Sequence, residues 1–178
     1  RIKNHYPHDY KHIVRYTSHA VPMFGDFIIQ PDDTGTVMLS WTDNTISDYE
    51  FLPHQLSDGS LRFIALATLL LQPESIMPQL IVIDEPALGL HPSAISLLAD
   101  MIKDASVHTQ VFIATQSPEL LDAFELENVH VIESKRINDN NYSCIVNFTD
   151  ENKAELSEWL KEYTLSEIWA KNVIGGRP

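Results

Sequence analysis

Residues 80–86 read LIVIDEP, and this short stretch decides the fold. Its four apolar residues, mostly β-branched, predict a buried strand of a parallel sheet, because such strands are covered on both faces. Two carboxylates and a proline end the run at once. Ligands of open α/β sheets bind where parallel strands end. The stretch therefore predicts an α/β fold with Asp84 and Glu85 at its ligand site.

The two carboxylates have the chemistry of a nucleotide-hydrolysing site. An Asp at a strand end can hold Mg²⁺, directly or through water, and the neighbouring Glu can polarise an attacking water. An acidic loop after a core strand would have the same sequence. The other motifs of the chain favour the first interpretation.

Residues 56–60, LSDGS, stand directly before the apolar run 61–71, which predicts a buried helix. Ser57, Gly59 and the helix amino terminus together can bind an anion through backbone N–H groups, a hydroxyl and the helix dipole. Ser and Asp are also common helix caps, so the motif alone permits a purely structural role. Its place ahead of the Asp-Glu-Pro strand end favours the anion site.

A third motif, ATQSPELL at residues 114–121, follows the next predicted strand, residues 110–114. Its polar residues should emerge at the same sheet edge as the acidic pair. Gln116 could then reach a phosphate or the attacking water. The alternative is a polar turn in which Ser117 caps a short helix over residues 118–124.

The remaining strands and helices are predicted from turn residues and the spacing of apolar residues. Turn residues 31–35 separate extended runs at 27–30 and 36–41, and a third run at 48–52 completes a small antiparallel meander. A helix from Pro92 is expected, with Ile95, Leu98, Met101 (or Ile102) and Ala105 along one face. Further strands are expected at 129–133 and 142–148 around a turn at 138–141. Asp150 can cap a last helix. Its apolar face comprises Leu156, Trp159, Leu160 and Tyr163. The helix–strand alternation from residue 61 onward predicts an α/β sheet.

These patterns divide the chain into a polar lead-in (1–20), an antiparallel β region (21–55), an α/β lobe (56–150) and a terminal helix and tail (151–178). The lead-in contains His5, His8, His12 and His19. Without paired Cys or acidic ligands, this spacing favours a solvated or partner-facing segment over a zinc site.

Composition narrows the function. A net charge of -13 argues against a surface that neutralises many phosphates, so this segment alone is not expected to bind nucleic acid. The single cysteine, Cys144, lies in an alternating stretch typical of a strand, and fits a reducing, cytoplasmic location. The longest apolar run, residues 63–71, is far shorter than the roughly 20 residues of a membrane span.

Together the motifs resemble ABC-class ATPase heads of the SMC/RecF/OLD-like branch. Residues 56–60 resemble the signature motif, 80–85 the Walker B motif, 86–92 the D-loop and 114–121 the switch region. The runs LSDGSLRFIALATLLLQP, IDEPALGLHP and ATQSPELLDAF, with the tail EWLKEY and GGRP, resemble a bacterial family of stand-alone ATPases of the AAA_21 type. The resemblance covers residues 21–178. It implies the carboxyl-terminal part of a head, with a mostly parallel sheet and flanking helices after a small antiparallel region.

The resemblance also implies roles for single residues. Asp84 would support Mg²⁺, and Glu85 would be the general base for ATP hydrolysis. The switch residue would be Gln116, where most ABC proteins have His; Gln can hydrogen-bond a phosphate but cannot become cationic. The remaining roles belong to the dimer interface. The signature would meet the γ-phosphate bound to the opposing subunit through Ser57, Asp58, Gly59 and Ser60. The D-loop would contribute Gly89, Leu90 and His91, the last standing where many D-loops have Asp.

No P-loop is present, because none of the six glycines is followed by Lys. The resemblance places that element in an amino-terminal half outside these residues. The expected function is ATP hydrolysis by an intact homodimer closed around ATP, with the isolated chain inactive. A degenerate head that acts as a non-enzymatic interaction module is the alternative. A nuclease and a transporter are less favoured, and a DNA or protein partner of the intact protein stays open.

Overall fold

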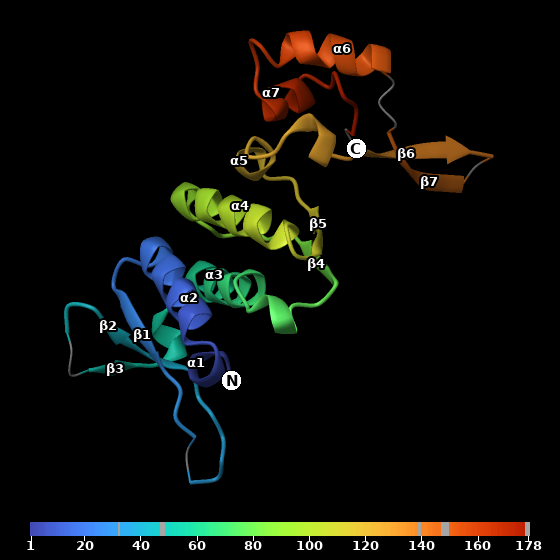
Figure 1. Cartoon of the computed structure of the whole chain (residues 1–178). Helices are drawn as coiled ribbons and strands as arrows, with labels where there is room; N and C mark the ends of the chain where they lie inside the picture. The colour runs from blue at the N-terminus through green and yellow to red at the C-terminus, as the bar shows by residue number, and fades with distance from the viewer. Residues whose placement is uncertain (32, 47–48, 139, 147–149, 177–178) are drawn as a thin grey trace. The chain divides into compact units, whose positions relative to one another are not determined.

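The computed structural model describes residues 1–31, 33–46, 49–138, 140–146 and 150–176 (Figure 1). The chain forms two compact units, Arg1–Thr115 and Gln116–Pro178, and each is described by itself. The limits at residues 20, 55 and 150 that the sequence suggested stay predictions.

The first unit begins with two helices in the polar lead-in, where the sequence had suggested no element. They are α1 (Ile2–His5) and α2 (Pro7–Ala20). Pro7 occupies the first turn of α2, where its missing N–H costs no hydrogen bond. Only Ile13 and Thr17 of α2 are buried, and the helix packs on α3 and α4. Among the described residues, no His, Cys, Asp and Glu side chains are grouped in a way that could hold a metal ion.

The small antiparallel region is confirmed. It is a three-stranded sheet in the order β1-β2-β3, formed by β1 (Phe24–Ile28), β2 (Ser40–Asp43) and β3 (Glu50–Phe51). The strands are shifted from the predicted runs because an aromatic cluster fixes the register. Phe24 and Phe27 pack with ring centroids 4.6 Å apart, and Trp41 stacks on Phe24 at 6.0 Å. Asp48, within the third predicted run, lies outside the described residues.

The predicted parallel strand pair is also confirmed. A 3₁₀ turn (Pro53–Gln55) leads into α3 (Asp58–Leu70), and a second (Glu74–Ile76) precedes β4 (Leu80–Asp84). The chain returns through α4 (Pro92–Ser106) to β5 (Gln110–Ala114). β4 and β5 pair in parallel, from Leu80 opposite Gln110 to Asp84 opposite Ala114. The expected apolar face of α4 is buried, and comprises Ile95, Leu98, Met101, Ile102 and Ala105.

The prediction that this sheet is buried on both faces is wrong. Exposure alternates along β4: Ile81 is 3% exposed, whereas Leu80 is 50% and Val82 is 70% exposed. Phe112 of β5 is also 50% exposed. The reason is that the described part of the unit supplies two parallel strands and covers one of their faces. α3 is likewise buried on one side rather than all round, since Arg62, Ala65 and Thr68 are exposed.

The second unit contains α5 (Pro118–Leu121), a 3₁₀ turn (Leu126–Asn128), β6 (Ile132–Ile137), β7 (Asn140–Ile145), α6 (Asp150–Trp159) and α7 (Leu165–Ala170). β6 and β7 form an antiparallel hairpin that includes Cys144, as predicted for that residue. The third strand of the predicted α/β alternation is therefore part of a hairpin, not of the parallel sheet. Residues 147 and 148, in the last predicted strand, and Asp139, in the predicted turn, lie outside the described residues.

The second unit has its own small core, into which α6 contributes Leu156 as predicted. Trp159 and Tyr163 pack against this core, whereas Leu160 is 37% exposed because α6 ends at Trp159. α7 was not predicted; a capping box between Thr164 and Glu167 starts it. The buried members of the core are Leu126, Val131, Leu156, Leu165, Ile168 and Ile174.

Candidate functional site

The acidic pair lies at the carboxyl end of β4, where the sequence predicted it. Asp84 is the last paired residue of the strand and is exposed. The next residue, Glu85, is half-buried, and its N–H donates to the Ala114 carbonyl at 2.8 Å. Its φ of 44° is in the left-handed region, which residues other than glycine rarely adopt. Such strain costs about 1–3 kcal/mol and is concentrated at functional sites.

A tight turn follows the acidic pair and forms the predicted D-loop. The Glu85 carbonyl accepts from the N–H of Leu88 at 3.2 Å, and the Ala87 carbonyl accepts from that of Leu90 at 3.1 Å. Gly89 has a φ of +77°, so glycine suits this position because it has no Cβ to clash. The buried Ala87 anchors the turn, whereas Leu88 is 63% exposed. The loop thus presents its tip to solvent.

His91 ends the D-loop and caps α4. Its Nδ1 accepts from the Ser93 N–H at 3.3 Å and lies 2.9 Å from the Ser93 hydroxyl. This arrangement satisfies an N–H in the first turn of α4 that has no partner within the helix. His91 therefore caps α4, and its role at the dimer interface stays a prediction.

The signature motif forms the amino terminus of α3. Ser57 is the N-cap: its Oγ accepts from the Ser60 N–H at 3.1 Å and lies 2.8 Å from the Ser60 Oγ. The capping alternative drawn from the sequence is therefore realised. It does not exclude the anion site, because Ser57 and Asp58 are exposed and the first N–H groups of a helix have no partner within it.

The signature motif and the D-loop touch each other. A Cβ placed on Gly59 would lie 2.2 Å from the Gly89 carbonyl oxygen, so the two backbones are in direct contact. One turn further along α3, the Arg62 Nη1 donates to the Glu85 carbonyl at 3.1 Å. The structure thus brings three of the predicted motifs together in one unit. Arg62 was missed, because an exposed arginine on a helix carries no signal in a single sequence.

Gln116 is the first residue of the second unit and is exposed there. Ser117 caps α5, since its Oγ accepts from the Leu120 N–H at 3.2 Å and donates to Glu119 Oε2 at 3.0 Å. The capping alternative for this motif is thus present. The place of Gln116 beside Glu85 stays a prediction.

Comparison with known proteins identifies the family. Residues 4–122, well over half of the chain, match the AAA_21 family, described as "AAA domain, putative AbiEii toxin, Type IV TA system". The chain belongs to this AAA-domain family. The match spans the signature, Walker B, D-loop and switch segments, so the resemblance to an ABC-class ATPase head of SMC/RecF-like type is confirmed.

Two curated relatives of this AAA-domain chain are ATP-binding proteins of energy-coupling factor transporters. It is 30% identical over 107 residues to the energy-coupling factor transporter ATP-binding protein EcfA of Methanosphaera stadtmanae, covering 59% of this chain and 36% of that protein. It is 27% identical over 147 residues to EcfA2 of Lactobacillus delbrueckii subsp. bulgaricus, covering 80% of this chain and 47% of that protein. The chain therefore spans less than half the length of these relatives. Among the described residues, no helix has the length and apolar character needed to cross a bilayer.

Solved structures show the same fold as this AAA-domain chain. A structure from work on ATP-driven dimerization and DNA-stimulated activation of SMC ATPases matches with a TM-score of 0.58 and 13% identity, covering 92% of this chain and 96% of that one. The Smc head of Pyrococcus furiosus, bound to the C-terminal domain of ScpA, matches with a TM-score of 0.62 and 15% identity. The match covers 90% of this chain and 39% of that one. The fold is thus that of an SMC ATPase head, mixed α/β with a parallel strand pair.

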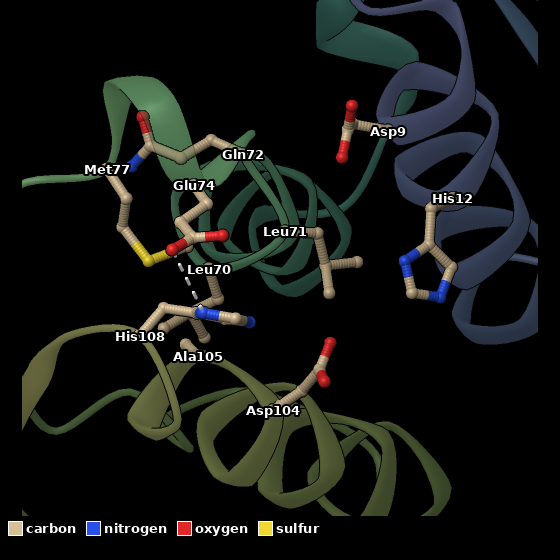
Figure 2. A pocket seen from close by; sticks show the side chains of 10 residues that line it. All are labelled: Asp9, His12, Leu70, Leu71, Gln72, Glu74, Met77, Asp104, Ala105 and His108. Carbon is tan, nitrogen blue, oxygen red and sulfur yellow. Dashed lines mark ion pairs between the residues drawn. The ribbon is translucent and has the colours of Figure 1, made fainter.

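A pocket of about 220 Å³ elsewhere in the first unit does not belong to this site (Figure 2). It lies among α2 and the carboxyl-terminal ends of α3 and α4, whereas the motifs lie at the amino-terminal ends of α3 and α4. His12 of the polar lead-in lines it. His108 faces Glu74 across it, with Nδ1 3.6 Å from Oε1. The pocket contains none of the residues that the motifs predict.

Proposed function

We propose that this chain is the carboxyl-terminal half of an ABC-type head that hydrolyses ATP within a homodimer. The observation that carries the proposal is the backbone of Glu85. A glutamate held at a φ of 44° directly after a parallel strand has an energetic cost, and that cost is understandable if the side chain must point at a reacting group. The membership of an ATPase domain family makes the β- and γ-phosphates of ATP the fitting ligand.

The acidic pair fits this chemistry. We assign Glu85 as the general base that accepts a proton from the attacking water. Asp84, exposed at the strand end, is the residue that would hold Mg²⁺, directly or through water. Mg²⁺ usually binds through one or two carboxylates together with substrate phosphates, so a single acidic strand end suits it better than an all-protein cage. When bound, the ion neutralises charge that develops on the phosphates.

The signature motif would serve the nucleotide of the opposing subunit. Ser57, Asp58, Gly59 and Ser60 surround a helix amino terminus that is open to solvent and suited to an anion. The contact of Gly59 with Gly89 places the D-loop beside it, so Gly89, Leu90 and His91 would meet the same partner surface. A similar structure comes from work on ATP-driven dimerization of SMC ATPases, which supports a homodimer here.

The Walker A half would complete the head from outside these residues. The open face formed by Leu80, Val82 and Phe112 is apolar, and burial of apolar area at about 25 cal/mol per Å² is the main drive for such docking. We propose that the amino-terminal half with the P-loop covers it. Without that half the chain would neither bind ATP with useful affinity nor hydrolyse it, and calorimetry on the isolated chain would detect no micromolar binding.

The decisive variant is Glu85→Gln in the intact protein. It should block turnover, leave ATP binding near the parent value and trap an ATP-bound dimer on gel filtration. Asp100→Asn, an exposed change of the same type on α4, should change none of these properties. Parent-level turnover by Glu85→Gln would remove the general-base role. An intact protein that never binds ATP would instead indicate a non-enzymatic interaction module.

A further inference from the structure

Arg62 is a cationic side chain that joins the signature helix to the turn after the Walker B strand. It lies on the exposed side of α3, five residues after the N-cap Ser57. Its guanidinium donates from Nη1 to the Glu85 carbonyl at 3.1 Å. Within the described residues it forms no ion pair with a carboxylate, and its guanidinium hydrogen-bonds to this backbone oxygen.

The carbonyl that accepts from Arg62 belongs to Glu85, the residue with the strained backbone. Both lone pairs of the Glu85 carbonyl are used, by Arg62 Nη1 and by the Leu88 N–H at 3.2 Å. On its other side, Glu85 is held through its own N–H, which donates to Ala114. A residue with a strained φ persists only where its surroundings fix it from several directions. Arg62 contributes a side-chain hydrogen bond to that fixation, and a charged donor makes a stronger hydrogen bond than a neutral one.

We infer that Arg62 is a positioning residue that holds the Glu85 peptide in its strained conformation and so aims the Glu85 carboxylate. This inference rests on the proposed ATPase function. Arg62 does not touch the reacting atoms; it acts through the backbone of Glu85. Because it is carried by the helix that begins with the signature motif, it also ties the orientation of Glu85 to the position of that helix.

The contacts from α3 connect the signature motif to the loop that carries Glu85. Gly59 and Arg62 stand on neighbouring turns of α3 and touch the two ends of the same short loop, Gly89 and Glu85. Movement of the α3 amino terminus when it meets a phosphate would therefore reach both ends of the loop. A nucleotide held by the signature motif would in this way influence the general base of the other site.

The test compares Arg62→Met with Arg62→Lys in the intact protein. Met keeps an unbranched stem of similar length without a donor, whereas Lys keeps a cationic donor. We expect Arg62→Met to lower kcat for ATP hydrolysis about 10- to 100-fold, with KM for ATP within about 2-fold of the parent, because a charged hydrogen bond is lost but phosphate contacts are not. Arg62→Lys should recover part of kcat.

Two further readings make the result decisive. In a Glu85→Gln background, Arg62→Met should still form the ATP-trapped dimer, which a general loss of the fold would prevent. Unchanged kcat in Arg62→Met would overturn the inference, as would equal losses of kcat in the Met and Lys variants. Turnover by Glu85→Gln alone at the parent rate would contradict the proposed function itself, and so the two failures are distinguishable.

Discussion

Gly59 of the signature motif lies against the carbonyl of Gly89 in the D-loop, with no space for a side chain between them. A Cβ on Gly59 would come within 2.2 Å of that oxygen, whereas a Cβ on Gly89 itself would meet nothing within 4 Å. The contact is therefore one-sided: glycine is required at Gly59 by its neighbour and favoured at Gly89 by its φ of +77°. It holds together the first turn of α3 and the D-loop, which are thirty residues apart in the sequence.

The first prediction concerns this contact. Gly59→Ala should push the first turn of α3 away from the D-loop and lower the free energy of unfolding by about 1–3 kcal/mol, the usual cost of overpacking. Urea unfolding of the variant and the parent would measure it. Ala65→Ser adds one atom on the exposed side of the same helix and should change stability by less than about 0.5 kcal/mol. A Gly59→Ala variant as stable as the parent would show that α3 and the D-loop separate at no cost in free energy.

The second prediction concerns the cap of α4. His91→Ala removes the acceptor for the Ser93 N–H and should lower the free energy of unfolding by about 1 kcal/mol. His91→Asp should restore it, because a carboxylate is a good N-cap and is favoured by the helix dipole. Urea midpoints of the two variants and the parent decide the matter. If Ala and Asp are equally stable, the side chain of His91 has no capping role.

The third prediction concerns the anchor of the lead-in helices on β1. The Tyr10 hydroxyl bonds to Asp26, and burial, followed by that bond, raises the pKa of Tyr10. A raised pKa means that the folded state retains this proton, so the stabilisation is complete below the unfolded pKa of about 10 and is lost above it. Tyr10→Phe should cost about 1–2 kcal/mol at pH 7 and less at pH 11. Urea unfolding at both pH values measures this, with Tyr142→Phe, an exposed tyrosine, as the control.

The local pattern of the sequence was sufficient to predict much of the fold. β5 has the predicted limits, and β4 is one residue longer than the predicted apolar run because it includes Asp84. α4 buries the predicted face because its apolar residues recur with helical spacing. The acidic pair was also placed correctly, since the end of a strand is visible in the sequence. In each case neighbouring residues alone determine the element.

The predictions from sequence failed where contacts between residues far apart in the sequence determine the structure. The open face of β4 could not be foreseen, because burial depends on what covers Leu80 and Val82 and not on their apolar character. α2 was missed because tertiary packing of Ile13 and Thr17, rather than a broad apolar stripe, accounts for its burial. The bond from Arg62 to Glu85 joins residues in different elements, and a single sequence carries no information on such pairs.

The last prediction separates the two roles of Ser57, which caps α3 and is proposed to meet the partner's γ-phosphate. Ser57→Ala removes both roles: it should lower the free energy of unfolding by about 1 kcal/mol and weaken ATP-driven dimerisation. Ser57→Asp keeps an N-cap acceptor for the Ser60 N–H but brings a negative charge towards the phosphate. This variant of the intact protein should therefore unfold at the parent urea concentration, bind ATP at its own P-loop normally and fail to dimerise on gel filtration. If Ser57→Asp dimerises with ATP as the parent does, the signature motif does not meet the opposing nucleotide, and Ser57 is a helix cap alone.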